Sequence, residues 1–274
     1  YACISNAVSE TSSSPYTYSE YIKKNNLEKL DSVITSNLIG LNRIINYNIK
    51  NDIHFYRMSS KIIPLATKED VSFDYINRYR KIYEEIGTNI KNSNMRVDFH
   101  PDQFCVLNST KKEVVENSIK ILEYHYILLD ALDVKNKLLV IHVGSSVLGK
   151  KNSIVRFINN YRKLPKYLRD CMAIENDDKV FNVDDVLYIS DMLNVPVVLD
   201  YHHHICNNQE VDINKYIEKN PNTVIMARSE AEKLGVGVGD VIYFEGGKYF
   251  DDGKPTHPQT IVAIYEDMPK NCMF

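Results

Sequence analysis

Short apolar segments alternate regularly along the sequence with longer segments of helical periodicity. Alternation of this kind is typical of βαβ units, which build a parallel sheet. The apolar runs are nearly continuous, as expected for strands that are buried on both faces. The predicted strands are residues 1–5, 53–60, 95–100, 138–144, 171–176 and 195–202, and the predicted helices are residues 21–49, 73–90, 112–132, 153–168 and 183–193.

Six consecutive units favour an α/β fold of the TIM-type (β/α) barrel over a doubly wound sheet. A doubly wound sheet of the Rossmann type requires a glycine-rich turn after an early strand, and the sequence has no such turn. The 274 residues are 44% hydrophobic and 25% charged, so the composition is that of a globular chain with a large core.

Charge and cysteine content limit the partners and the compartment. The net charge of −3 gives no overall attraction to nucleic acid or anionic lipid. The basic run between Lys150 and Arg169 is either a solvated helix face or a local patch for a nucleic-acid backbone. The five cysteines are widely spread without a CxxC pair, and no apolar run reaches the ~18 residues that span a bilayer. We therefore expect a cytoplasmic protein with no membrane partner.

Polar residues that can bind metals stand at the ends of four successive predicted strands. These residues are His100, His142, Glu175, and Asp200 with His203. A single histidine in such a place is usually a hydrogen-bonded structural residue. In a parallel barrel, however, all the carboxyl ends of the strands lie on one face, where barrel enzymes build their sites. Imidazole and carboxylate ligands without thiolate suit Zn²⁺ or Mn²⁺, so the pattern predicts a metal site.

Several motifs over residues 1–206 resemble the UV DNA damage endonucleases, relatives of the endonuclease IV group with a TIM-barrel fold. In chain order the motifs are "YRMSSKIIPLAT", "RVDFHPDQFCVLNS", "LEYHY", "IHVG", "IENDDK" and "VLDYHHH". The resemblance implies a DNA repair enzyme that incises the backbone of damaged double-stranded DNA on the 5′ side of a UV photoproduct. It also implies a cluster of up to three metals, usually Mn²⁺, with Zn²⁺ or Mg²⁺ as alternatives.

The resemblance also suggests which residue holds which metal. By the family pattern His100 and His142 hold one metal, Asp200 contributes to a second and His203 to a third. Glu175 is the best placed to bridge two of them, because a carboxylate has two oxygens and this one lies in the middle of the set. We expect Glu175 and His142 to be catalytic, since closely spaced divalent metals supply a hydroxide and neutralise charge on the phosphate.

Lesion recognition is predicted for other residues. By resemblance, Gln103 and Phe104 probe the duplex and fill the gap left by flipped bases; the alternative for Phe104 is a core position in the next helix. Tyr1 contacts the lesion by the same resemblance. Arg57 either holds a DNA phosphate or belongs to an internal polar plug.

The C-terminal part departs from the family. The resemblance implies a seventh and an eighth strand that carry further ligands, and none of these motifs follows Cys206. Glycine becomes frequent after residue 234, and the remaining apolar runs predict strands. We therefore expect an incomplete barrel over residues 1–218 and a small β-rich tail over residues 219–274. An active endonuclease and a weakened or inactive remnant that still binds metal and damaged DNA both fit; a sugar isomerase-type barrel fits less well.

Overall fold

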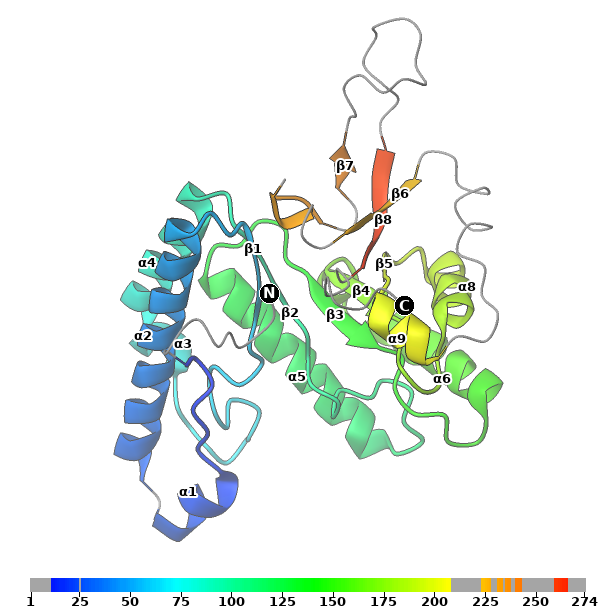
Figure 1. The fold of residues 1–274 in the computed structure, drawn as a ribbon. Coiled ribbons are helices and arrows are strands. Elements are labelled where there is room, and N and C mark those ends of the chain that lie inside the picture. The colour runs from blue at the N-terminus through cyan, green and yellow to red at the C-terminus, as the bar shows by residue number, and fades with distance from the viewer. Residues whose placement is uncertain are drawn as a thin grey trace, which may run out of the picture.

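Strands and helices alternate along most of the chain (Figure 1). The computed structural model describes residues 11–24, 26–207, 223–227, 231–233, 235–237, 240–242 and 259–265. Five strands form a parallel sheet in chain order: β1 (Phe55–Met58), β2 (Arg96–Phe99), β3 (Leu139–His142), β4 (Met172–Glu175) and β5 (Val197–Val198). The helices are α1 (Tyr18–Lys24), α2 (Leu27–Lys50), α3 (Tyr75–Arg78), α4 (Arg80–Asn92), α5 (Lys112–Ala131), α6 (Lys150–Lys163), α7 (Lys166–Arg169), α8 (Val183–Leu193) and α9 (Tyr201–Cys206).

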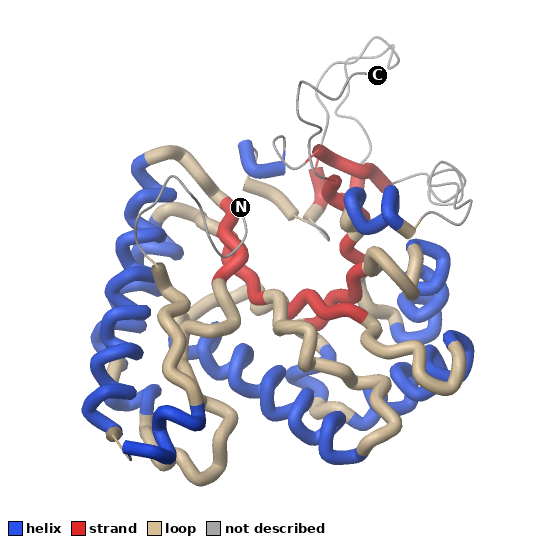
Figure 2. The backbone as a smooth tube through the Cα atoms, turned by 60° about the horizontal axis from the view of Figure 1, so that its bottom comes forward, coloured by secondary structure: helices blue, strands red, loops and turns tan. Residues whose placement is uncertain are grey.

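The strands form a curved row with the helices on its outer side (Figure 2). This arrangement is an α/β fold of the TIM-barrel type, as predicted, although hydrogen-bonded strands do not close a ring among the residues that the structure describes. The predicted strand at residues 1–5 lies outside those residues. None of the described helices is both long and apolar enough to cross a membrane.

The core lies between the outer helices and the sheet. Helix α2 buries apolar residues at a spacing of three and four, which places them on one face of the helix. Strands β2, β3 and β4 are almost fully buried, as expected for a sheet covered on its outer side. Glycines permit close approaches at two places on the helices. A side chain at Gly40 would clash with the carbonyl of Thr11, and one at Gly87 would clash with the carbonyl of Leu132.

Several predicted elements have different bounds in the structure. The predicted helix over residues 73–90 forms α3 and α4, and the one over residues 153–168 forms α6 and α7. The predicted strand over residues 195–202 is wrong beyond Val198, because residues 201–206 form α9. The Asp200 side chain accepts the backbone N–H of His203 and thereby starts the helix. The predicted helix over residues 21–49 is divided into α1 and α2, and Asn26 caps the second helix.

The C-terminal strands form a separate small sheet, as the prediction of a β-rich segment requires. Strand β8 (Gln259–Tyr265) lies between β6 (Thr223–Ala227), which is parallel to it, and β7 (Val241–Ile242), which is antiparallel. Strand β8 also contacts β5 (Figure 1). The boundary between a barrel and a tail at residue 218 stays a prediction.

Candidate metal centre

Three strand ends bring their side chains together. Strands β3 and β4 pair in register, so that His142 lies beside Glu175. His100 follows directly after β2, which is the other neighbour of β3. Each of the three residues offers a ligand atom, and these atoms all lie within 4.8 Å of one another. The parallel register therefore turns residues that are far apart in the sequence into one cluster.

Glu175 is the centre of this cluster. Its side chain is 3% exposed, and its Oε2 lies 2.7 Å from His100 Nε2 and 3.6 Å from His142 Nε2. Burial opposes the charged form of Glu175, but the hydrogen bond from His100 and the charge of Arg57 lower its pKa well below the usual range. Burial also opposes charging of His100, yet the bond to Glu175 raises the pKa of His100 above its ordinary value. An anionic carboxylate is therefore maintained at a buried position.

His142 has the properties of a metal ligand. Burial is the main cause that lowers its pKa, and the nearby His100 and His203 act in the same direction, so the ring is kept neutral. Its Nδ1 is buried and has no hydrogen-bond partner among the described residues. Two imidazoles and one carboxylate match the three-ligand sets of catalytic metal sites, which leave a coordination position open. The donor set of the group thus fits a divalent metal ion.

Asp200 and His203 lie next to this group but do not belong to it. The His203 ring centroid is 5.4 Å from that of His142. His203 Nδ1 is 3.0 Å from the backbone carbonyl of Asn176, and it is 3.7 Å from Asp200 Oδ2. The Asn176 amide also exchanges two hydrogen bonds with the Asp200 backbone, at 2.9 and 2.8 Å. These contacts brace the ends of β4 and β5 against each other. The metal-binding roles of Asp200 and His203 stay predictions.

The loop after His100 exposes two neighbouring side chains. Gln103 is exposed, and Phe104 is 68% exposed. The backbone N–H of Phe104 donates to Asp102 Oδ1 at 2.9 Å, which fixes the turn. Helix α5 begins only at Lys112, so Phe104 is neither in the core nor in the next helix. Its contact with a lesion stays a prediction.

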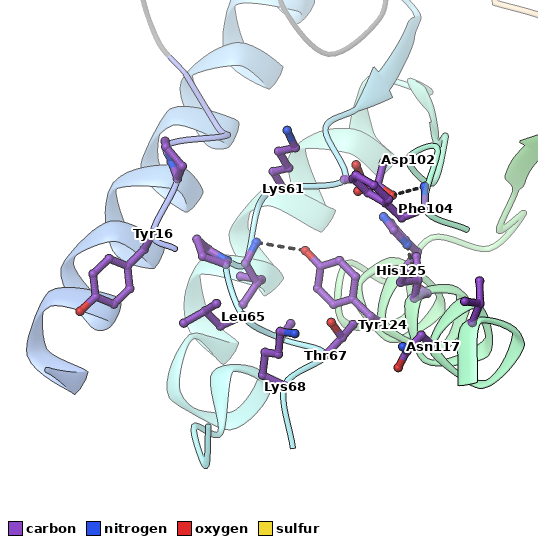
Figure 3. A pocket seen from close by; sticks show the side chains of 17 residues that line it. Tyr16, Lys61, Leu65, Thr67, Lys68, Asp102, Phe104, Asn117, Tyr124 and His125 are labelled. Carbon is purple, nitrogen blue, oxygen red and sulfur yellow. Dashed lines mark hydrogen bonds between the residues drawn. The ribbon is translucent and has the colours of Figure 1, made fainter. Parts of the chain in front are cut away.

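A cavity of about 560 Å³ lies beside Phe104 (Figure 3). Its walls come from the N-terminal segment, the loop after β1 and helix α5, and the Tyr124 hydroxyl accepts the backbone N–H of Ile63 at 3.0 Å across it. Sequence reasoning missed this cavity, although the segment "KIIPLAT" that lines it follows a predicted strand end.

The two remaining predicted DNA contacts differ in where they lie. Tyr1 is outside the described residues. The Arg57 side chain is 13% exposed; its Nε donates to Asp98 Oδ1 at 3.2 Å, and its Nη1 lies 3.7 Å from Glu175 Oε1. The sequence analysis missed Asp98, because only the strand register places it beside Arg57. A contact of Arg57 with DNA stays a prediction.

A model of the family "UV-endonuclease UvdE" matches residues 1–227. The chain belongs to this family. UV DNA damage endonucleases of Bacillus cereus (strain G9842) and Bacillus anthracis (strain A0248) are 40% and 39% identical over 192 residues, which are 70% of this chain and 61% of each relative. The chain thus spans 61% of the length of these curated relatives. The predicted resemblance is confirmed, and the match extends beyond residue 206.

Solved structures agree on the fold. The crystal structure of SacUVDE is 31% identical, has a TM-score of 0.75, and covers 97% of this chain and 91% of its own. A D-psicose 3-epimerase solved in the presence of D-fructose has a TM-score of 0.51 at 15% identity, over 84% of this chain and 80% of its own. The second similarity concerns the fold alone.

Proposed function

We propose that this chain is a metal-dependent endonuclease that incises the DNA backbone on the 5′ side of UV photoproducts. The observation that carries the proposal is the group of His100, His142 and Glu175 at neighbouring strand ends, in a chain of the UV-endonuclease UvdE family. The carboxyl ends of the strands are the face where barrel enzymes bind substrate.

In this proposal His100, His142 and Glu175 hold the metal, and Asp200 and His203 extend the site. We propose Mn²⁺, with Zn²⁺ or Mg²⁺ as alternatives. A bound divalent ion supplies a hydroxide near neutral pH and neutralises charge on the phosphate. Glu175 contributes the buried negative charge of the ligand set, and His142 contributes a neutral ring at the end of β3. These two residues are the proposed catalytic side chains.

The proposed substrate is damaged double-stranded DNA. Chemistry next to a damaged dinucleotide requires it to leave the base stack. Phe104 is free to stack in the gap, because it is exposed on a fixed loop that begins at the ligand His100. Gln103 lies beside it and can donate to or accept from the orphaned bases. Tyr1 and Arg57 complete the proposed contacts.

A second candidate is a weakened enzyme or inactive remnant that still binds metal and damaged DNA. One observation favours it: the metal-binding group found among the described residues has three members. This candidate predicts binding of UV-damaged DNA without turnover.

Nicking of a UV-irradiated supercoiled plasmid in Mn²⁺ separates the two candidates. We expect nicks in the irradiated plasmid, none in the unirradiated plasmid, and loss of nicking in Glu175→Gln. Glu84→Gln, at an exposed position of α4, is the matched control and should nick like the unaltered chain. Binding of irradiated DNA without nicking would support the remnant, and equal nicking by Glu175→Gln would reject the metal centre.

A further inference from the structure

A line of alternating charges runs through the interior to the metal centre. Arg57 on β1 and Asp98 on β2 are partners in the strand register, and Arg57 Nε donates to Asp98 Oδ1 at 3.2 Å. The other side of the guanidinium approaches Glu175, with Nη1 3.7 Å from Oε1. Glu175 turns its second oxygen, Oε2, toward His100 and His142. The charged and ionisable groups therefore follow one another in the order Asp98, Arg57, Glu175, and then the imidazoles of His100 and His142.

These charges are withdrawn from solvent. The side chains of Asp98 and Arg57 are 2% and 13% exposed. Both line a small cavity of about 30 Å³, and C-terminal residues that include Val236 and Gly237 line its other side. Removal of one partner from a buried pair leaves an uncompensated charge, and such a charge acts strongly on its neighbours when water is excluded.

We propose that Arg57 and Asp98 are positioning residues that set the metal affinity of the centre through Glu175, an inference that rests on the metal centre of the proposed function. In the empty site, Arg57 balances the buried charge of Glu175. With a metal bound, the guanidinium would repel the cation, and Asp98 would balance that repulsion. Arg57 and Asp98 together therefore compensate the buried charge of Glu175 and add no large net charge near the metal.

The chemistry of arginine suits this position. The planar guanidinium has donors in a fixed fork and stays charged, so one side chain can face two carboxylates on different strands. A lysine ammonium is a point charge on a flexible stem and cannot present two fixed donor edges. Arg57→Lys should therefore keep the charge but lose one of the two contacts with Asp98 and Glu175.

The test uses the sign of the change in metal affinity. We would measure the Kd of the metal-free full chain for Mn²⁺ by isothermal titration calorimetry. Asp98→Asn should weaken binding about tenfold or more, because the Arg57 charge then acts unbalanced. Arg57→Met should tighten binding by a similar factor, because two carboxylates then face the cation. The Arg57→Met/Asp98→Asn double variant should return to within about threefold of the unaltered chain.

A merely structural role would weaken metal binding in both single variants, and that outcome would overturn the proposal. Arg78→Met removes an arginine that pairs with Asp31 at the surface, and it should leave the Kd unchanged. Arg57→Met leaves two buried carboxylates without their cation and can fail to fold. In that case the double variant is compared with Asp98→Asn alone. A recovery of Mn²⁺ affinity in the double variant supports the proposal, and a further loss overturns it. If the unaltered chain does not bind Mn²⁺, the metal centre itself is rejected and this inference with it. If the unaltered chain binds Mn²⁺ but both single variants bind it more weakly, only this inference is rejected.

Discussion

Phe104 is a large apolar side chain that the fold leaves in solvent beside a cavity. If it fills the gap left by flipped bases, Phe104→Ala should reduce the preference for damaged over intact duplex by about 1–3 kcal/mol, the value of one base–aromatic stack. Fluorescence anisotropy with both duplexes at one salt concentration measures this preference. Tyr188→Ala removes another exposed aromatic, on α8, and should change neither affinity. Equal losses on both duplexes in Phe104→Ala would contradict the proposed wedge.

His125 makes the stability of the fold depend on pH. Its ring packs between Phe99 and Tyr124, and its Nδ1–H donates to the Ile121 carbonyl at 2.7 Å. Burial lowers the pKa of His125 to about 4 from an ordinary value of 6.5, and the nearby His100 charge acts in the same direction. Between these values the unfolded chain binds more protons than the folded chain. The contribution of His125 is therefore complete above pH 6.5 and is lost as the pH falls toward 4.

The expected loss over that interval is roughly 3 kcal/mol in the free energy of unfolding. His125→Leu cannot take up the proton, so its stability should fall less steeply with acidification. Urea unfolding at several pH values from 7 to 4 gives both profiles. Parallel profiles would show that other groups carry the acid sensitivity.

At the scale of elements, the structure predicts an unusual response at Gly87 in α4. Alanine in place of a glycine inside a helix normally stabilises by roughly 0.5–1 kcal/mol. Here the added Cβ would lie 2.3 Å from the carbonyl oxygen of Leu132 at the end of α5, so the two helices must separate. Gly87→Ala should therefore destabilise by about 1–3 kcal/mol, the cost of overpacking. Thr88→Ala, at an exposed position of the same helix, should change stability little, and a stabilised Gly87→Ala would refute the close contact.

How well an element could be predicted depended on how local its determinants are. Helix α8 has the predicted bounds, because the Asn182 and Asp185 capping box marks its start and its apolar period is regular. The segment after β5 was misassigned, because apolar residues lead directly into Asp200, which is a helix cap rather than the continuation of a strand. Two residues of the basic run between Lys150 and Arg169 have partners within the fold. Lys150 pairs with Asp185, and Arg156 donates to the carbonyl of Asn108.

At the same scale, part of the candidate site could be predicted from the sequence. His100, His142 and Glu175 could be grouped from the sequence because each ends a strand and parallel strands end on one face. The contact of Arg57 with Asp98 and Glu175 could not, since it depends on which residues face each other across the register. Such pairings require the tertiary structure.

At the scale of the whole molecule, the C-terminal segment is packed against the sheet. Asp240 lies 3.7 Å from Arg96 at the start of β2, and Gly237 is buried against the same arginine. Val236 and Ala231 line the small cavity beneath Arg57. The change of composition in the sequence indicated a distinct segment but contained no information on where it docks. The described residues between 231 and 240 therefore lie at strand starts, whereas β8 contacts β5 and α9.

The number of metal ions bound per chain tests whether residues outside the group of His100, His142 and Glu175 supply further ligands. Among the described residues, one group of three ligands lies close enough to hold an ion, and Asp200 and His203 are not part of it. We predict about one tightly bound divalent metal per chain, measured by elemental analysis after dialysis. Chelation should lower the free energy of unfolding by about 2.7 kcal/mol relative to metal at a hundred times its Kd. Glu175→Gln should lose both the metal and this stabilisation. Three tightly bound metals would show that Asp200, His203 and residues after 207 complete the cluster, and the proposed division of the chain at residue 218 would then be wrong.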